Sequence, residues 1–235
     1  MLAIYKRELR SYFVTPIGYI FVAVYLIVSG IIFSICTISA GSGSSVATYF
    51  TMLLYMFIIV LPLLTMKLFA DEKKSRTEQL LLTAPVSLMG MVTAKFLAAY
   101  SVFAGTFLIS CFNFVPLYYY GSPNTAIIFG SSLALLLVGA ACIAVGVFIS
   151  SLTENQLIAA LATMLVILFF MMTTALNSYI DSTVIRTVLS WVSIFDRYVN
   201  FAYGYFDVNA ILYYASVSFA FLFLTVRVYE RRRWN

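Results

Sequence analysis

Residues 125–150 read TAIIFGSSLALLLVGAACIAVGVFIS and contain no charged side chain. A helix rises about 1.5 Å per residue, so this run is long enough to cross the ~30 Å hydrocarbon core of a bilayer. Similar uncharged runs recur along the chain, in which 63% of the 235 residues are hydrophobic and 10% are charged. Soluble domains carry about 25% charged residues. The sequence therefore predicts an all-α, polytopic membrane protein that forms a single domain over residues 1–235.

Six transmembrane helices are predicted. Their ranges are residues 17–39, 48–69, 90–119, 125–150, 156–176 and 208–228. Residues 1–15 place large apolar side chains at helical spacing among Lys6, Arg7 and Arg10, which favours an amphipathic helix on the membrane surface over a disordered basic tail. Lys95 lies inside the third span, and we expect its side chain to extend back to the aqueous edge.

The distribution of basic residues predicts the orientation of the chain. With a cytoplasmic N-terminus, twelve of the fourteen Lys and Arg residues lie on the cytoplasmic side, and the other two are Arg186 and Arg197. Both termini are then cytoplasmic. This asymmetry accounts for the net charge of +5, so no nucleic-acid partner is expected.

The segment DEKKSRTEQLLLTAPVS (71–87) is far more polar than the predicted spans on either side. Ser75 and Glu78 have the spacing of a capping box, which predicts a short helix that begins at Arg76. Pro85 biases the residue before it to an extended backbone, so this helix should end near Thr83. Three consecutive leucines at 80–82 cover more than one of its faces. We interpret the segment as a docking element for another protein; the alternative is a solvated loop whose leucines enter the headgroup region.

Two other connections carry polar residues. In the turn SSLTENQ (150–156), Thr153 or Ser151 has helix-capping chemistry for the fifth span. Residues 178–206 are too long for a turn and too charged to span, which predicts a re-entrant helical segment in the outer leaflet. Its charged residues are candidate contacts for an anionic substrate or lipid, with ordinary anchoring at the membrane interface as the alternative. These residues are Arg186, Asp196 and Arg197.

The sequence lacks the groups on which membrane enzymes and ion-coupled carriers depend. There is no histidine, the predicted spans carry no Asp or Glu at mid-depth, and there is no GxxxxGK[ST] phosphate loop. Three isolated cysteines have no metal-ligand spacing. We therefore expect no catalytic, cofactor-binding or metal-binding residues in this chain.

The combined features resemble the membrane subunit of type 2 ABC exporters, and most closely the gliding-motility-type permeases of bacteria. The resemblance covers essentially the whole chain, and its most specific element is FADEKKSRTEQLLLTAPVS (69–87). It implies an ATPase docking element after the second span, with a secondary contact at Thr153, Glu154 and Gln156. The implied docking residues are Glu72, Arg76, Thr77, Glu78, Leu80, Leu81, Leu82 and Pro85. Arg76 is a departure, because many members have Gly there.

The resemblance also implies the partners and the location. The partners would be two copies of an ABC ATPase subunit, which binds ATP and Mg, a second permease subunit in a homo- or heterodimer, membrane lipids and an auxiliary extracellular subunit. The location would be the bacterial cytoplasmic (inner) membrane. Two other functions stay open at this point: a scaffold that transmits ATPase-driven work to an extracellular partner, and a secondary carrier or channel.

Overall fold

The computed structural model describes residues 1–38, 45–77, 87–120, 123–177, 191 and 193–234. All regular elements among these residues are helices, and six of them are long and apolar enough to cross a membrane. The candidate spans are Pro16–Cys36, Val46–Lys74, Leu88–Tyr119, Thr125–Leu152, Gln156–Leu176 and Val208–Arg232. The prediction of an all-α, six-span membrane protein is therefore confirmed.

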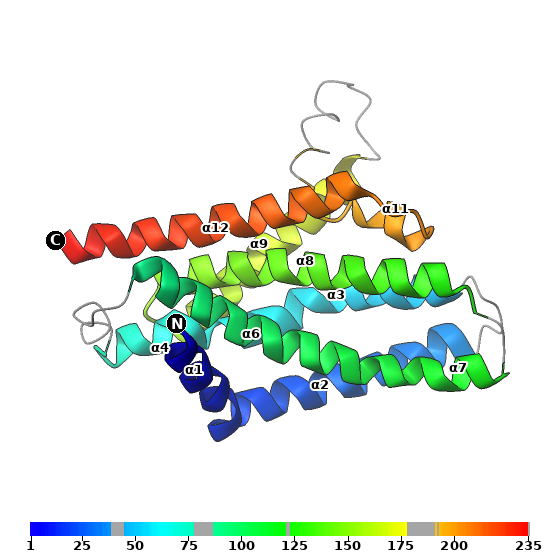
Figure 1. Cartoon of the computed structure of the whole chain (residues 1–235), viewed down its shortest axis with the longest axis horizontal. Coiled ribbons are helices and arrows are strands. Elements are labelled where there is room, and N and C mark those ends of the chain that lie inside the picture. The colour runs from blue at the N-terminus through cyan, green and yellow to red at the C-terminus, as the bar shows by residue number, and fades with distance from the viewer. Residues whose placement is uncertain (39–44, 78–86, 121–122, 178–190, 192, 235) are drawn as a thin grey trace.

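The helices follow one another with few interruptions (Figure 1). The elements are α1 Leu2–Val14, α2 Pro16–Phe33, the π-helix η1 Ser34–Ile38, α3 Ser45–Thr65, α4 Lys67–Lys74, α6 Leu88–Ser110, the 3-10 helix η2 Cys111–Phe114, α7 Val115–Tyr120, α8 Thr125–Leu152, α9 Gln156–Asn177, α11 Tyr198–Ala202 and α12 Val208–Trp234. Ser87 caps α6, because its side chain accepts a hydrogen bond from the Gly90 N–H. Asn124 caps α8 in the same way.

Helix α8 is the centre of the bundle and contacts α3, α4, α6, α9, α11 and α12. Two glycines allow its neighbours to approach closely. A Cβ atom at Gly139 would lie 2.3 Å from the Phe103 ring of α6, and one at Gly146 would lie 2.3 Å from the Thr65 hydroxyl of α3. Helix–helix packing in membranes depends on such small residues, because lipid supplies little hydrophobic drive for association. These two glycines thus serve packing inside the chain.

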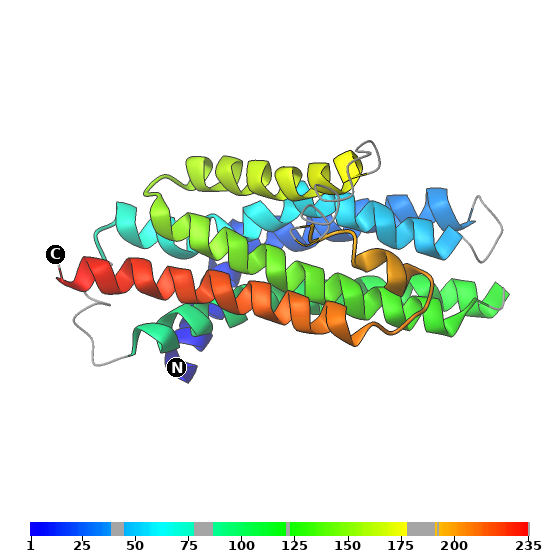
Figure 2. The same cartoon turned by 90° about the horizontal axis from the view of Figure 1, so that it is seen from above.

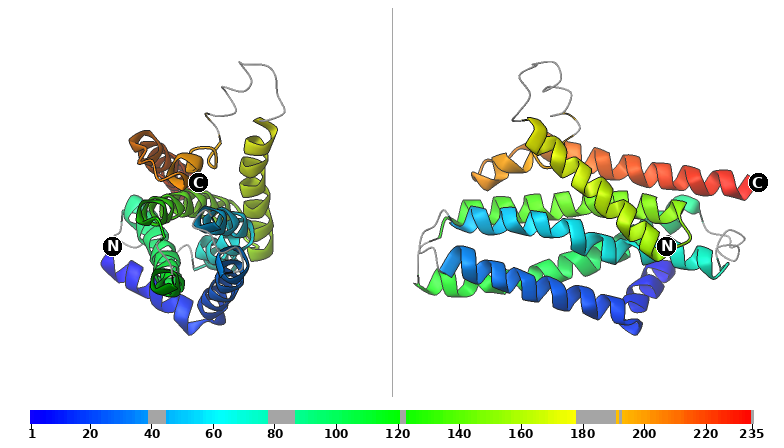
Figure 3. Two further views of the ribbon diagram at one scale, coloured as in Figure 1. Left: turned by 90° about the vertical axis from the view of Figure 1, so that its right-hand side faces the viewer. Right: turned by 180° about the vertical axis from the view of Figure 1, so that it is seen from behind.

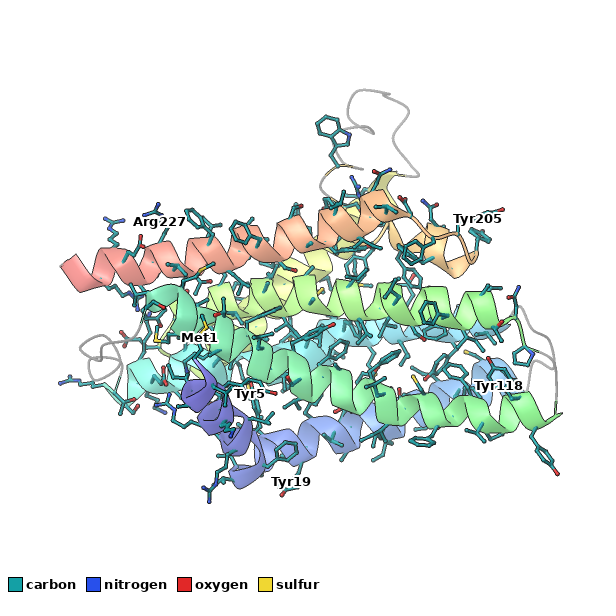
Figure 4. All side chains as sticks on the ribbon, in the orientation of Figure 1. Met1, Tyr5, Tyr19, Tyr118, Tyr205 and Arg227 are labelled. Atoms are coloured by element: carbon teal, nitrogen blue, oxygen red, sulfur yellow. The ribbon has the colours of Figure 1, made fainter. Side chains whose placement is uncertain are left out.

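The bundle has two different ends (Figures 1 and 2). One end carries α1, α4, the first turns of α6, the turn 153–155 and the C-terminal turns of α12; we call it the charged end. The opposite end carries η1, η2, α7 and α11. Met1 and Tyr5 lie toward the charged end, whereas Tyr118 and Tyr205 lie at the opposite end (Figure 4). Both termini therefore lie at the same end of the bundle.

Helix α9 stands on the outside of the bundle and crosses it obliquely (Figure 3). It contacts α3, α4 and α8. Its outer face is lined by exposed apolar side chains, including Leu157, Leu165 and Phe169. This composition is that of a surface which meets lipid or another apolar surface.

The structure corrects several details of the sequence-based reading. The third span is divided into α6, η2 and α7, and the second is divided into α3 and α4. Neither Thr153 nor Ser151 caps α9; the Asn155 side chain does so by accepting a hydrogen bond from the Leu157 N–H. In the described part of the predicted re-entrant segment, Tyr198 and Phe201 are buried core residues. A dip into the outer leaflet stays a prediction.

Candidate functional site

The break between α3 and α4 at Met66 is the starting point of the site. Pro62 lies inside α3 and has no N–H to donate to the helical hydrogen-bond ladder. One turn later, the hydroxyl of Ser150 in α8 enters the ladder itself. It donates to the Met66 carbonyl at 3.2 Å and accepts from the Phe69 and Ala70 N–H groups at 3.2 Å each. A side chain of a different helix therefore satisfies the backbone groups that the break exposes.

Four charged side chains from three elements meet beside α4. Lys95 of α6 places its Nζ 2.9 Å from Oε1 of Glu72 in α4 and 3.3 Å from Oε1 of Glu8 in α1. The Arg7 guanidinium of α1 is 2.8 Å from the same Glu72 oxygen and 2.7 Å from Glu8. Lys95 Nζ also donates to the Leu68 carbonyl at 2.7 Å. We call Arg7, Glu8, Glu72 and Lys95 the ionic cluster.

Lys95 does not extend to water, in contrast to the sequence-based expectation. Its side chain is 0% exposed, whereas Glu8 and Glu72 are 12% and 16% exposed. The reason is that two carboxylates, a carbonyl and the face of the Phe69 ring, 4.9 Å from Nζ, replace its hydration shell. Burial by itself lowers the pKa of Arg7, but the neighbouring Glu8 and Glu72 carboxylates outweigh it and raise the pKa overall.

Helix α1 is bound to the bundle by further polar contacts. The Tyr12 hydroxyl donates to the Leu64 carbonyl of α3 at 2.8 Å, and the Tyr5 hydroxyl donates to Ser101 Oγ of α6 at 2.9 Å. Lys67 of α4 donates to the hydroxyls of Ser11 and Thr15, at 3.1 Å and 2.8 Å. Burial raises the pKa of Tyr12 well above its ordinary value, so its hydroxyl stays protonated and remains a donor. Residues 1–15 are thus a helix packed on α3, α4 and α6.

The last turn of α4 differs from the predicted start of a helix. Ser75 is the C-cap residue of α4, and its hydroxyl donates to the Asp71 carbonyl at 2.8 Å. Arg76 has a φ of 58°, which lies in the left-handed region that glycine favours. A helix cannot begin at such a residue, so the predicted start at Arg76 is wrong. Glycine, which many members of the resembled family carry here, adopts this conformation without the steric cost that a side chain adds.

Helix α4 also contacts the turn that precedes α9. The Gln156 amide donates to the Asp71 carboxylate, which connects the first turn of α9 to α4. Both residues belong to segments that the sequence analysis assigned to docking. The structure therefore brings the two predicted docking segments, 71–87 and 153–156, into contact with each other.

A cavity of about 640 Å³ opens at the charged end between α1, α4 and α6. The ionic cluster lines it together with Ser11, Lys67, Asp71, Ser75 and Thr77. Three cationic and three carboxylate side chains face it, so its formal charge is balanced. This arrangement holds the three helices together and does not select an ion of either sign.

The other predicted site residues are distributed as follows. Glu72 faces the ionic cluster, Arg76 and Thr77 are exposed beyond α4, and Thr153 and Glu154 lie in the turn before α9. Glu78, Leu80, Leu81, Leu82, Pro85 and Arg186 lie outside the described residues. At the opposite end, the Arg197 guanidinium lies 4.0 Å from the centre of the Tyr213 ring, and Asp196 precedes it. Their roles toward a substrate or lipid stay predictions.

Several residues at this site were not identified from the sequence as parts of it, among them Arg7, Glu8, Lys95 and Ser150. Lys95 carried a recognisable signal, because a lysine inside an apolar span requires a partner. Its partners are distant in the sequence and could not be named. Ser150 gave no signal, since serine is common in membrane helices and usually bonds within its own helix.

A second hollow of about 760 Å³ lies between α3, α9 and α11 toward the opposite end. Its walls are mostly apolar, and a few hydroxyl-bearing residues such as Thr51, Tyr55 and Thr174 interrupt them. Such a surface accommodates a lipidic or amphipathic molecule and provides a few hydrogen-bond partners.

Comparison with known proteins gives one match. The model of the family described as "ABC-2 family transporter protein" matches residues 37–229, which is most of the chain. No curated protein matches the chain. The matched range includes α4, Lys95 and Ser150 and begins after α1.

Proposed function

The chain belongs to the ABC-2 family of transporter proteins, and on this premise we propose that it is the permease subunit of an ATP-driven exporter of the bacterial inner membrane. Its termini and its charged end face the cytoplasm in this proposal. A separate ATPase subunit binds and hydrolyses ATP with Mg²⁺, and a second permease copy or homologue completes the pathway. The gliding-motility-type subgroup and an auxiliary extracellular subunit are finer hypotheses that rest on sequence resemblance.

The observation that carries the proposal is the set of contacts made by α4. This short helix lies directly before residues 75–87 and is bonded to α1 through Glu72, to α6 through Lys95, to α8 through Ser150 and to α9 through Asp71. A force applied to residues 75–87 would therefore reach four other helices. An element that only anchored the topology would not require such contacts.

The apolar hollow between α3, α9 and α11 supports a lipidic or amphipathic substrate. It opens on the outside of the bundle beside α9, whose outer face is also apolar. In our proposal a second permease subunit faces this side, and the substrate moves outward between the two subunits. The direction of transport is inferred from the sequence resemblance to exporters.

Co-purification with the ATPase subunit encoded beside the chain tests this function. Wild type is compared in nanodiscs with Leu81→Asp, which places a charge in the leucine run 80–82. The matched control is Tyr205→Asp, because Tyr205 is 73% exposed at the opposite end. We expect wild type and the control to bind the ATPase and to alter its ATP turnover, and Leu81→Asp to lose both properties while still inserting into the membrane.

Three results would contradict the proposal. The first is a wild-type chain that binds no ATPase. A secondary carrier driven by an ion gradient would then be the leading hypothesis. The second is normal ATPase binding by Leu81→Asp, which would remove the leucine run from the docking surface. The third is labelling of a Ser75→Cys variant from only the outer side of the membrane, because the docking segment would then face away from the ATPase.

A further inference from the structure

Lys95 lies where α1, α4 and α6 meet. It belongs to α6, bonds Glu72 and the Leu68 carbonyl of α4, and lies 3.3 Å from Glu8 of α1. It has no exposed surface. Glu72 of α4 also contacts all three helices, because it pairs with Lys95 of α6 and with Arg7 of α1. Any displacement of α4 must therefore either carry α6 and α1 along or break these bonds.

An ionic cluster with a fully buried lysine and two largely buried glutamates is an expensive way to stabilise a bundle. Removing charges from water costs several kcal/mol per ion, and apolar residues of similar volume often stabilise a protein as well or better. Aliphatic side chains would therefore serve if the only requirement were to hold α1, α4 and α6 together. Charged hydrogen bonds differ in being short and directional, so they fix one relative arrangement of the helices.

The position of Glu72 relates this cluster to the proposed docking segment. Glu72 lies in the last turns of α4, three residues before Ser75, where the helix ends. At the other end of α4, the break at Met66 is held by a single serine hydroxyl. Helix α4 is thus a short rigid element with a break at one end and the ionic cluster near the other. Force on residues 75–87 would turn it about the break and act directly on Lys95.

We propose that Lys95 is a positioning residue that transmits displacement of α4 to α6. The inference rests on the proposed function, since it takes the displacement to come from an ATPase subunit. Lys95 contributes no binding to that subunit, because it is enclosed between α1, α4 and α6. Its loss should therefore leave ATPase binding intact and remove the response of α6.

Hydrogen–deuterium exchange on the complex of full-length chain and ATPase tests the inference. Exchange of peptides that cover α1, α4 and the first turns of α6 is compared without nucleotide and with ATP plus vanadate. The variants are Lys95→Met, which keeps the length of the side chain, and Glu72→Gln, which keeps its shape and removes its charge. Arg227→Met is the matched control, because it breaks an exposed ion pair with Glu230 at the same end.

In wild type and the control, nucleotide should change exchange in all three helices. In Lys95→Met, the change should persist in α4 and in α1, which Glu72 and Lys67 of α4 still bond, and be lost in α6, with the ATPase still bound. Glu72→Gln weakens the bonds of Glu72 to both Lys95 and Arg7, so it should reduce the response of α6 and of α1. The double variant should lose no more of the α6 response than Lys95→Met alone, because both changes act on the Lys95–Glu72 bond. A purely structural role would instead raise exchange of α1 equally with and without nucleotide and leave the response of α6 unchanged.

Two results overturn the inference and are distinguishable from each other. If α6 of Lys95→Met responds as in wild type, Lys95 transmits nothing, although the proposed function stands. If the wild-type chain binds no ATPase or shows no nucleotide response in any helix, the proposed function fails and the inference fails with it. Because the second result is read from wild type alone, misfolding of a variant cannot imitate it.

Discussion

The two ends of the bundle are held together by different forces. At the charged end, α1, α4, α6, α8 and α9 are joined by ion pairs and hydrogen bonds between residues that are distant in the sequence. At the opposite end, Phe33, Tyr49, Phe50 and Phe114 form an aromatic group whose rings pack at centroid distances of 5.3–5.7 Å. One end is specified by directional polar contacts and the other by packing.

This difference has a functional meaning. Aromatic packing resists separation and is less strictly directional, since ring pairs accept both offset-stacked and edge-to-face geometries. Buried polar groups each need a partner, so only a few arrangements satisfy all of them. When one arrangement breaks, the helices change to another distinct arrangement. An end that receives a mechanical input benefits from the second kind of contact. The following predictions test whether the two ends really differ in this way.

Lys95→Met should have the largest effect on stability. It leaves the Glu8 and Glu72 carboxylates buried with only Arg7 as their partner, which should lower the free energy of unfolding by about 3–5 kcal/mol. The exposed ion pair of Arg227 and Glu230 is the comparison, and Arg227→Met should cost less than about 1 kcal/mol. Unfolding in mixed micelles, followed by circular dichroism, measures both. Equal effects of the two variants would show that burial of the cluster has no energetic consequence.

Phe114→Ala should have a smaller effect at the opposite end. Phe114 is 4% exposed and contacts three other rings. Large-to-small substitutions of this kind cost about 3–5 kcal/mol in water-soluble cores, but much of that is transfer from water, which is reduced in a membrane. We expect about 2–3 kcal/mol in the same unfolding experiment. Phe112→Ala is the control, because Phe112 is 73% exposed in the same turn; a similar cost for both would contradict a role of packing.

Ser150→Ala tests the break at Met66. It leaves the Phe69 and Ala70 N–H groups without their hydrogen-bond acceptor in a buried position, which should cost about 1–2 kcal/mol. Ser151→Ala is a matched control, because the Ser151 hydroxyl bonds only the Phe148 carbonyl of its own helix. Exchange of the Phe69 and Ala70 amides should rise in the first variant and not in the second. Unchanged exchange would mean that the backbone of α4 closes the break without Ser150.

Asp207→Ala should have the smallest effect and should depend on pH. Asp207 accepts from the Asn200 side chain and from the Asn209 N–H at the start of α12, and these bonds lower its pKa below the ordinary value of 3.8. Its stabilising contribution is therefore complete above about pH 4 and is lost as pH falls through the lowered pKa. At neutral pH the substitution should cost about 1 kcal/mol, as for other helix caps.

The melting temperatures of wild type, Asp207→Ala and Asp207→Asn are measured between about pH 3 and pH 7. This range extends from below the ordinary pKa of an aspartate to well above it. The asparagine variant keeps a capping oxygen and should be more stable than the alanine variant. It should also lack the loss of stability that wild type shows at the acidic end. A wild-type curve that is flat with pH would show that Asp207 is not bonded as described.

The fold was largely predictable, whereas the site was predictable only in part. Long uncharged runs permit few structures other than membrane-spanning helices, because backbone polar groups must be satisfied within each segment. The segment 71–87 was proposed as a docking element from its charge and its leucine run, and that role stays a prediction. The capping-box spacing at Ser75 was misleading, because the same serine closes the preceding helix. Local spacing does not reveal whether a polar side chain faces forward to a new helix or backward to the last turn.

The sequence by itself determined the class of the protein, the number and approximate limits of its spans, and the segregation of basic residues to one end. These properties follow from local composition and from the thickness of a bilayer. Only the tertiary structure decided that Lys95 is enclosed by Glu8 and Glu72, that Ser150 completes the break at Met66, and that Gln156 reaches Asp71. Each of these contacts joins segments far apart in the chain, and the choice of partner depends on how six similar apolar helices pack.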